Sequence, residues 1–378
     1  MRELKEVLGE FKGISENPKE QFEALLSRGE KVVGCLTYFC PEEIIYAAGM
    51  VPFGLWGGDL EATESKRWFP AFICSILQTA LELGIRGEYD GMKAIMVPKL
   101  CDSLKCMGAN WECAVPGIPV INVAHAQNRK MSAGVEFTAS QYRAVTAELA
   151  RHGGKSASDD SIRGAIGLLN KRRSALREFT RLAALNPGSV SPKARNDVLK
   201  SSYFMDAGTY TPMLQELNGM LAALPRSDWD GVRVVTTGIL ADSQELLGIL
   251  EDNRVAIAGD QVLHESVSFR EDVSGDGDPI AALASRMAAI EGTSVLYDPE
   301  KRRVMELLEL VRETSAGGVI YVLTKFCDPD EYDYVPVKQL LEANGVPCLL
   351  VEVDRQTSGY EQARSAVEAF AGMIRKKV

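Results

Sequence analysis

Histidine is scarce in this chain of 378 residues: His125, His152 and His264 are its only three. So few imidazoles argue against a His-rich zinc site. Phosphate-binding glycine motifs are also missing, and without a G-x-G-x-x-G or Walker loop the sequence gives a nucleotide site no support. Apolar runs stay short of the roughly 18 residues that span a bilayer. Because the N-terminus, "MRELKEVLGEFKG", has the pattern of a charged amphipathic helix rather than a signal peptide, we expect a cytoplasmic protein with no membrane role.

Positive charge is in deficit, with 42 basic against 52 acidic residues and a net charge of −10. A polyanion such as DNA would be repelled on average, so binding to nucleic acid is disfavoured. The short basic cluster Lys171-Arg172-Arg173 is interpreted as a solvated helix face. Hydrophobic residues make up 46% of the chain and charged residues 25%, which is a globular composition with room for two or three domains.

Strand-like apolar runs alternate with helix-like segments in both halves of the chain. Such near-continuous apolar strands indicate parallel sheets covered on two faces. The predicted strands are 31–38, 50–57, 91–98 and 118–125, then 232–238, 254–260, 317–326 and 347–353. Residues 292–303 are compatible with a short strand or with a loop. In "ADSQELLGILED" the pair Asp242 and Glu245 predicts a capping box at a helix start.

The middle of the chain is richer in helix and more polar. The sequence therefore predicts an α/β protein of two doubly wound, Rossmann- or flavodoxin-like domains joined by a helical segment. We place the N-terminal domain at 1–136, the helical segment at 137–228 and the C-terminal domain at 229–378.

Eight cysteines are present, yet no C-x-x-C occurs, and the spacing of Cys101, Cys106 and Cys113 matches no common zinc or ferredoxin run. Position is more informative than spacing. Functional groups of open parallel sheets gather beyond the carboxyl ends of strands. Cys101 and Cys327 each follow a predicted strand, and Cys74 lies near the start of a predicted helix, where backbone N–H groups are free.

Cys327 has an acidic neighbourhood, "CDPDEYDY", that would weaken a free thiol as a nucleophile. We interpret Asp328 as a helix N-cap and Pro329 as a first-turn residue, with the carboxylates directed away from the sulfur. Cys327 would then face backbone N–H groups, which suit a thiolate or the sulfides of an iron–sulfur cluster.

The residues alone leave three interpretations open: a dispersed metal or cluster site, buried core cysteines without a role, or a reactive thiol. His125 could serve a thiol as a base, although a structural histidine is favoured. The aromatic residues Trp56, Trp68 and Trp111 are expected in the core. Glu42 and Glu43 are interpreted as partners of a helix dipole.

Six stretches of the sequence resemble the 2-hydroxyacyl-CoA dehydratases, in particular their smaller β subunit. They are "CPEEIIYAAGMVPFGLWGG" (40–58), "FPAFICSILQTALELG" (69–84), "CDSLKCMGANW" (101–111), "HAQNRK" (125–130), "TGILADSQELLGILEDN" (237–253) and "KFCDPDEYDY" (325–334). In this order they extend over nearly the whole chain. Enzymes for 2-hydroxyisocaproyl-, phenyllactyl- or lactyl-CoA resemble it most, followed by those for 2-hydroxyglutaryl-CoA.

The resemblance implies an oxygen-sensitive heterodimer in which each subunit holds a [4Fe–4S] cluster through three cysteines, here Cys74, Cys101 and Cys327. Cys40 and Cys106 are weaker candidates. It also implies radical elimination of water from an (R)-2-hydroxyacyl-CoA, through a ketyl radical anion, to a 2-enoyl-CoA. An ATP-dependent iron–sulfur activator protein would supply the electron, the α subunit would bind most of the substrate, and this chain would be the electron relay.

Two alternatives are retained. A related ATP-dependent reductase or double-cubane cluster protein would hold more iron per chain. A non-enzymatic α/β scaffold with inert thiols would hold none.

Overall fold

The computed structural model describes residues 2–225, 229–356 and 359–376. Two four-stranded sheets organise the fold, and every strand pair in them is parallel. The first sheet contains β1 (Val32–Leu36), β2 (Val51–Leu55), β3 (Ala94–Pro98) and β4 (Val120–Val123). The second contains β5 (Val232–Gly238), β6 (Val255–Val262), β7 (Gly318–Thr324) and β8 (Cys348–Val353). All eight predicted strands are confirmed, and residues 292–301 form a loop with no strand.

The two sheets share one topology. Their strand orders are β2-β1-β3-β4 and β6-β5-β7-β8. The strands all run in parallel, but the order in which the chain adds them reverses between the two central strands of each sheet. In the first sheet Gly34 lies opposite Phe53 on β2 and Ile95 on β3. The reversal places a crevice beyond the carboxyl ends of β1 and β3, and another beyond those of β5 and β7. The predicted fold class is confirmed.

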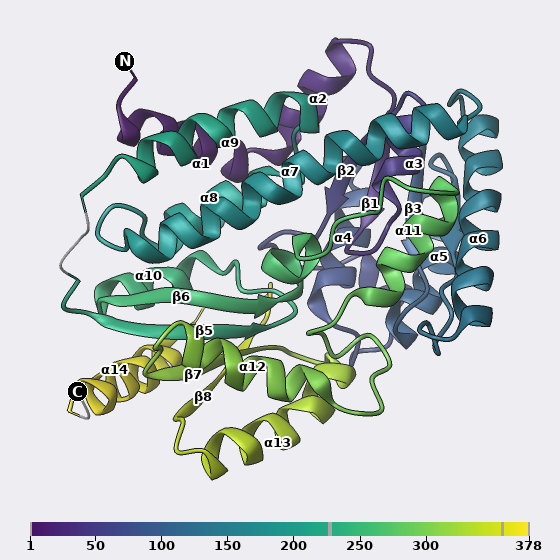
Figure 1. The fold of residues 1–378 in the computed structure, drawn as a ribbon. Coiled ribbons are helices and arrows are strands. Elements are labelled where there is room, and N and C mark those ends of the chain that lie inside the picture. The colour runs from purple at the N-terminus through teal and green to yellow at the C-terminus, as the bar shows by residue number, and fades with distance from the viewer. Residues whose placement is uncertain (1, 226–228, 357–358, 377–378) are drawn as a thin grey trace.

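Helices cover both faces of each sheet (Figure 1). Those before β5 are α1 (Leu4–Glu16), α2 (Pro18–Ser27), α3 (Glu42–Ala47), α4 (Ser75–Ile85), α5 (Asp102–Ala114), α6 (Ser132–Arg151), α7 (Asp159–Leu185), α8 (Pro192–Ser201) and α9 (Ala207–Ala222). Those after it are α10 (Gln244–Asp252), α11 (Pro279–Ala289), α12 (Arg302–Glu313), α13 (Asp328–Ala343) and α14 (Glu361–Arg375). Among the helices described, none combines the length and the apolar composition that a membrane-spanning segment needs.

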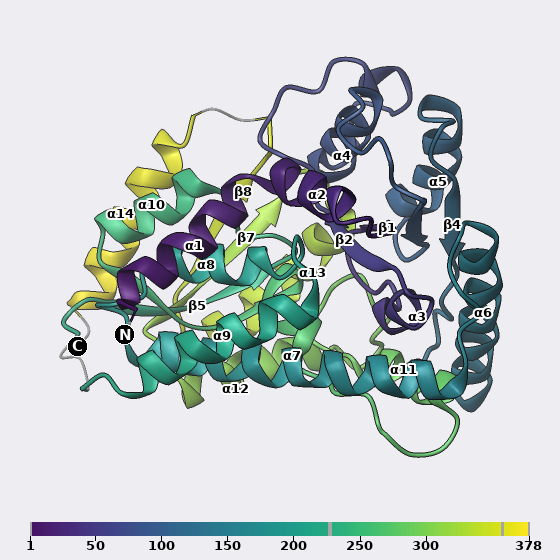
Figure 2. The same ribbon diagram turned by 90° about the horizontal axis from the view of Figure 1, so that it is seen from above.

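Several elements connect the two halves. The long helix α7 contacts α3 beside the first sheet and β6 in the second, and Figures 1 and 2 show it crossing the molecule. Helix α11 follows the second sheet's β6 in sequence but packs against α6, on the flank of the first sheet. A single apolar cluster also joins residues of the first sheet to Ile239, Leu263 and Ile290. The domain boundaries at 136/137 and 228/229 stay predictions.

Candidate functional site

Three cysteines occupy the N-cap positions of three different helices. Cys74 precedes α4, Cys101 precedes α5 and Cys327 precedes α13. Cys101 comes shortly after β3, and Cys327 shortly after β7, so each lies beside the switch point of its own sheet. Two of these helices therefore belong to the first half of the chain and one to the second.

The fold brings these three side chains to one place. Each is half-buried, and all three pack against the apolar cluster that joins the two halves. Burial raises the pKa of the Cys74 thiol to about 12, and the neighbouring Cys101 adds to the rise. Burial also raises the pKa of Cys327, with contributions from Asp330, Cys74 and Cys101. The thiols thus lie within electrostatic range of one another, and their raised pKa values keep them neutral at pH 7.

Backbone N–H groups at the helix starts act in the opposite direction. The Cys74 side chain accepts no capping hydrogen bond at the start of α4. The backbone amides of Leu77 and Ile76 nevertheless lower the pKa of the Cys74 thiol, against the effect of burial. The amides of Leu104 and Ser103 do the same for Cys101. At each of these sulfurs, therefore, the first turn of a helix favours negative charge.

Cys327 receives less of this support, because Pro329 takes the second helical position and has no N–H. Only the amide of Asp330 lowers its pKa among the leading causes. The prediction of Asp328 as the N-cap is wrong: Cys327 itself is the N-cap, and Asp328 is the first helical residue. The chain turns one residue earlier than the Asp-Pro pattern indicates.

The carboxylates near Cys327 are held by cations. Asp330 is fully buried, and its Oδ1 accepts hydrogen bonds from Arg303 Nη1 at 3.1 Å and Tyr321 Oη at 2.9 Å. Asp333 accepts from Arg303 Nη1 at 3.1 Å and Lys301 Nζ at 2.6 Å. These contacts largely neutralise the negative charge behind the sulfur, although Asp330 still raises the pKa of Cys327.

Arg355, in the loop after β8, joins the two halves next to Cys74. Its side chain donates to Trp56 O at 3.0 Å, Asp59 Oδ1 at 2.9 Å and Asp242 Oδ2 at 2.8 Å. Its backbone N–H donates to Ser75 Oγ at 3.0 Å, directly beside Cys74. The second half of the chain thereby fixes the start of α4, a cysteine-bearing helix of the first half.

This contact also explains a wrong prediction. Asp242 is not part of a capping box, because its carboxylate binds Arg355. The N-cap of α10 is Ser243, whose Oγ accepts from the amide of Leu246. The side chain at 242 serves the interface between the halves, and the next residue supplies the cap.

The donor set fits an iron–sulfur cluster better than a single metal ion. Within the part of the chain that the structure describes, no three His, Cys, Asp or Glu side chains lie close enough to hold one ion. A cubane cluster binds each cysteine through a different iron, so its ligands stand further apart. Three thiols near helix N-terminal amides in apolar surroundings match the environment of such clusters.

The remaining cysteines lie elsewhere. Cys106 and Cys113 are exposed on α5, Cys35 is buried in β1, and Cys348 is half-buried at the start of β8. Cys40 donates weakly to Met96 O, with 3.6 Å between sulfur and oxygen. None of these shares the N-cap position that Cys74, Cys101 and Cys327 have in common.

His125 follows β4 and lines a cavity of about 520 Å³ between the halves, which Leu100 and Pro329 also border. Its Nε2 is 3.2 Å from Tyr142 Oη, and burial lowers its pKa to about 4. The ring is therefore neutral at pH 7, and its contact with a tyrosine supports the structural interpretation. Among the tryptophans, Trp56 and Trp111 are buried as expected, whereas Trp68 is exposed.

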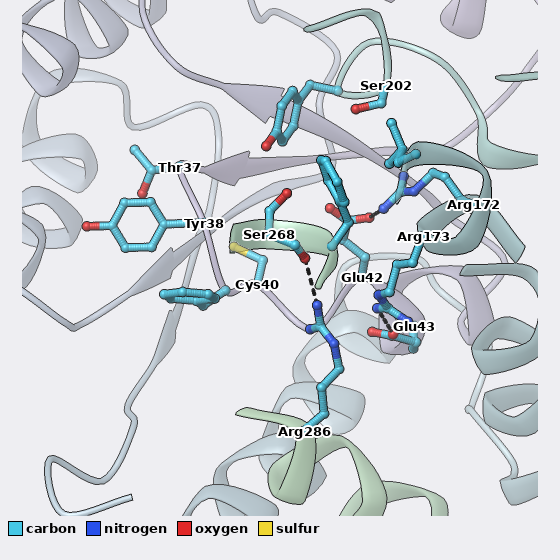
Figure 3. Close-up of a pocket in the computed structure, with 14 residues that line it drawn as sticks. Thr37, Tyr38, Cys40, Glu42, Glu43, Arg172, Arg173, Ser202, Ser268 and Arg286 are labelled. Atoms are coloured by element: carbon cyan, nitrogen blue, oxygen red, sulfur yellow. Dashed lines mark hydrogen bonds and ion pairs between the residues drawn. The ribbon is translucent and has the colours of Figure 1, made fainter. Parts of the chain in front are cut away.

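Beneath the turn that follows β1 lies a narrow pocket rich in charge (Figure 3). Arg172 binds Glu42 and Arg173 binds Glu43 there, and Arg286 Nη2 donates to Ser268 O at 2.7 Å. The prediction of a solvated basic face is wrong for Arg172 and Arg173, because these ion pairs bury both side chains. It holds for Lys171, which is exposed. Glu42 and Glu43 do lie in the first turn of α3 as expected.

Sequence reasoning missed Arg303 and Arg355, the two arginines that organise the surroundings of Cys327 and Cys74. Both lie in polar stretches that look solvent-exposed, "EKRR" and "DRQ". Arg303 is the cation that Asp330 needs, because Asp330 is fully buried in the first turn of α13, and the sequence gives no sign of that burial.

Taken together, the fold and the site define a two-sheet α/β protein with three converging helix-capping cysteines. The family described as 2-hydroxyglutaryl-CoA dehydratase, D-component, matches residues 37–374, and the chain belongs to this family. It is 44% identical over 363 residues to the (R)-phenyllactyl-CoA dehydratase beta subunit of Clostridium sporogenes, covering 96% of this chain and 97% of that relative.

Two further relatives carry related names. The (R)-2-hydroxyglutaryl-CoA dehydratase subunit beta of Acidaminococcus fermentans is 39% identical over 97% of this chain and 98% of its own length. The lactoyl-CoA dehydratase subunit beta of Anaerotignum propionicum is 33% identical over 99% of this chain and its full length. The resemblance inferred from the sequence motifs is thereby confirmed.

Proposed function

We propose that this chain is the β subunit of an oxygen-sensitive (R)-2-hydroxyacyl-CoA dehydratase, and that Cys74, Cys101 and Cys327 hold a [4Fe–4S] cluster. The observation that carries the proposal is the convergence of three helix N-caps from both halves on one apolar site. When bound, such a cluster accepts and releases single electrons at low potential. The family membership and the names of the relatives support the dehydratase assignment.

The proposed reaction removes water from a 2-hydroxyacyl-CoA by a radical route to a 2-enoyl-CoA. The β-hydrogen of the substrate is barely acidic, so one electron added to the thioester carbonyl must precede loss of the hydroxyl as hydroxide. After the β-proton has also left, the electron returns to the enzyme, and the net change is the loss of one water. This chain's part is to hold the electron-carrying group away from water. The half-buried cysteines and their apolar surroundings provide that exclusion.

A partner α subunit and an ATP-dependent activator complete the proposed enzyme. The relatives are named beta subunits, which implies a partner. Large aromatic side chains are exposed beside the cysteines: Phe72 is 67% exposed and Phe326 is 38% exposed. Apolar surface of this kind marks protein–protein contacts, so we assign the partner to this side of the site. Dehydration by this chain and activator without an α subunit would contradict the division of labour.

The cluster assignment is tested by anaerobic purification followed by iron and sulfide analysis. We expect about four irons and four sulfides per chain with a broad visible absorption that air bleaches. Cys327→Ala should lose the cluster, whereas Cys106→Ala should keep it, because Cys106 is exposed on α5. Full iron retention in Cys327→Ala would remove Cys327 from the ligand set. About eight irons would favour a double-cubane relative, and a folded, iron-free chain would favour a scaffold.

A further inference from the structure

The cavity between the halves, which His125 lines, lies beyond the carboxyl ends of strands from both sheets. Lys99 and Leu100 directly follow β3, and His125 follows β4. Pro329 comes from the start of α13, after β7, and residues 293–299 border the cavity from the loop before α12. Ligands of open parallel sheets bind at this edge, and binding sites often lie between domains. The volume of about 520 Å³ is within the usual range of small-molecule sites.

More cations than carboxylates line this cavity. Among the described residues, the cations are Lys99, Lys105, Lys301 and Arg303, and the carboxylates are Asp298 and Asp333. Asp333 accepts hydrogen bonds from Lys301 Nζ at 2.6 Å and from Arg303 Nη1 at 3.1 Å, so two cations neutralise it. Asp298 accepts from the backbone N–H groups of Glu300 and Arg303, within its own turn.

Lys99 is the cation of this set that no described carboxylate holds. Lys105 Nζ donates to Asp102 Oδ1 at 2.9 Å, whereas Lys99 forms no ion pair with any residue that the structure describes. The backbone N–H of Lys99 donates to Val123 O at 2.8 Å and so fixes the residue at the edge of the sheet. Lys99 is half-buried, and a partly desolvated ammonium group is stabilised by an anion.

Three buried polar atoms around the cavity also lack a partner. They are His125 Nδ1, Thr293 Oγ1 and Ser294 Oγ, and none forms a hydrogen bond with a described residue. All three residues line the cavity. Because buried polar groups are hydrogen-bonded in the great majority of cases, a ligand that carries several polar atoms suits this wall.

The rest of the lining is largely apolar, and its members are Leu100, Ala126, Val295, Leu296, Pro299 and Pro329. A bare inorganic ion would leave this surface without a partner, and a wholly apolar ligand would leave Lys99 uncompensated. The lining therefore fits an organic anion with a compact charged group and a less polar body. Phosphate suits the charged group, because lysine pairs with phosphate oxygens and hydroxyl groups donate to them.

We propose that this cavity binds an organic phosphate, with Lys99 as its charge partner. Within the proposed function, the ligand is the CoA part of the substrate, which carries phosphate groups at one end and the thioester at the other. The assignment to CoA rests on the proposed function, whereas the affinity for an organic phosphate does not. Leu100 precedes Cys101 and Pro329 follows Cys327, so the bound ligand lies beside two of the proposed cluster ligands.

The test is anaerobic calorimetric titration of the full chain with three probes: S-methyl-CoA, which has no free thiol, ADP and inorganic phosphate. Lys99→Met removes the charge, and Ala126→Trp fills the cavity. Lys93→Met is the matched control, because Lys93 is exposed and precedes β3, at the opposite end of the same strand. Circular dichroism and iron content are measured for every variant as checks of the fold and the cluster.

We expect saturable binding of S-methyl-CoA to the unmodified chain and weaker binding of ADP and of inorganic phosphate. Lys99→Met should weaken the binding of S-methyl-CoA by about tenfold, as loss of one charge-assisted hydrogen bond does. Ala126→Trp should abolish that binding, and Lys93→Met should leave it unchanged. Undiminished binding in Lys99→Met and Ala126→Trp would overturn the assignment of the cavity.

The other outcomes separate this inference from the proposed function. ADP that binds as tightly as S-methyl-CoA would overturn the assignment to CoA and support a site for organic phosphates in general. A chain with about four irons that binds neither probe would overturn the cavity assignment and leave the proposed function intact. An iron-free chain that binds S-methyl-CoA would overturn the cluster and leave the cavity assignment intact.

Discussion

Replacing Arg303 by methionine should destabilise the second half of the protein far more than the same change at the adjacent Arg302. Arg303 is 3% exposed, and its guanidinium binds Asp330 and Asp333, both at 3.1 Å. The side chain also reaches Thr237 Oγ1 at 3.2 Å and so connects β5 to α13. Methionine keeps much of the apolar stem and removes only the charge and its hydrogen bonds.

The expected loss follows from what remains after the change. Removing one partner of a buried ion pair costs about 3 to 5 kcal/mol, because the other charge is left uncompensated. Asp333 retains Lys301 at 2.6 Å, so Asp330 carries most of the penalty. Asp330 Oδ1 keeps the hydroxyl of Tyr321 at 2.9 Å, which limits that penalty. We therefore expect a loss of about 3 kcal/mol, at the lower end of this range.

The measurement is urea unfolding of the metal-free chain in reductant, followed by circular dichroism. Arg302 pairs with Glu300 at the surface, where their side chains are 51% and 65% exposed, so Arg302→Met should change stability by less than about 1 kcal/mol. Adding Asp330→Asn to Arg303→Met should recover part of the loss, because the buried carboxylate is then gone. Equal stabilities of Arg302→Met and Arg303→Met would refute the reasoning.

Two further predictions concern the buried surroundings of the site. His264 is 1% exposed and burial lowers its pKa to about 3, so stability should fall as pH drops from about 6.5 toward 3, by roughly 1.4 kcal/mol per pH unit for this group. His264→Phe should flatten that slope in urea midpoints taken between pH 7 and 4.5, and an unchanged slope would contradict it. Gly84→Ala should cost about 1 to 3 kcal/mol, because a Cβ there would meet Trp111 Cη2 at 2.7 Å. Gly167→Ala, in a helix with open space around it, should stabilise by up to about 1 kcal/mol, and thermal unfolding that ranks the two alanine variants the other way would refute this.

Most of the strands were predictable because they are buried on both faces, whereas the edge strands β4 and β8 also carry exposed residues. β1 and β7 are buried along their whole lengths, which produces the apolar runs that the sequence displays. The candidate cysteines were predictable by position for a related reason. Parallel strands all end at one edge, so a cysteine that follows a strand arrives at that edge whatever the loop conformation.

The buried charges were not predictable, since their partners are remote in sequence. Arg173 and Glu43 lie 130 positions apart, and Arg355 and Asp59 lie 296 apart. A charged residue on a polar helix face gives no local sign that another element will cover it. The N-cap predictions were wrong for a different reason. Asp, Ser and Cys can all serve as an N-cap, and at α10 Asp242 binds Arg355 while Ser243 caps the helix.

The acidic neighbourhood of Cys327 has a consistent physical meaning in this arrangement. Burial raises the pKa values of the three thiols, so they are neutral at pH 7 and binding of the proposed cluster would release protons. Helix-start amides favour the thiolates, whereas Asp330 opposes the thiolate at Cys327. Arg303 limits that opposition by forming an ion pair with the Asp330 carboxylate. Cys327 belongs to the second half of the chain and the other two cysteines to the first, so the proposed ligand set depends both on charge balance at the start of α13 and on contact between the halves.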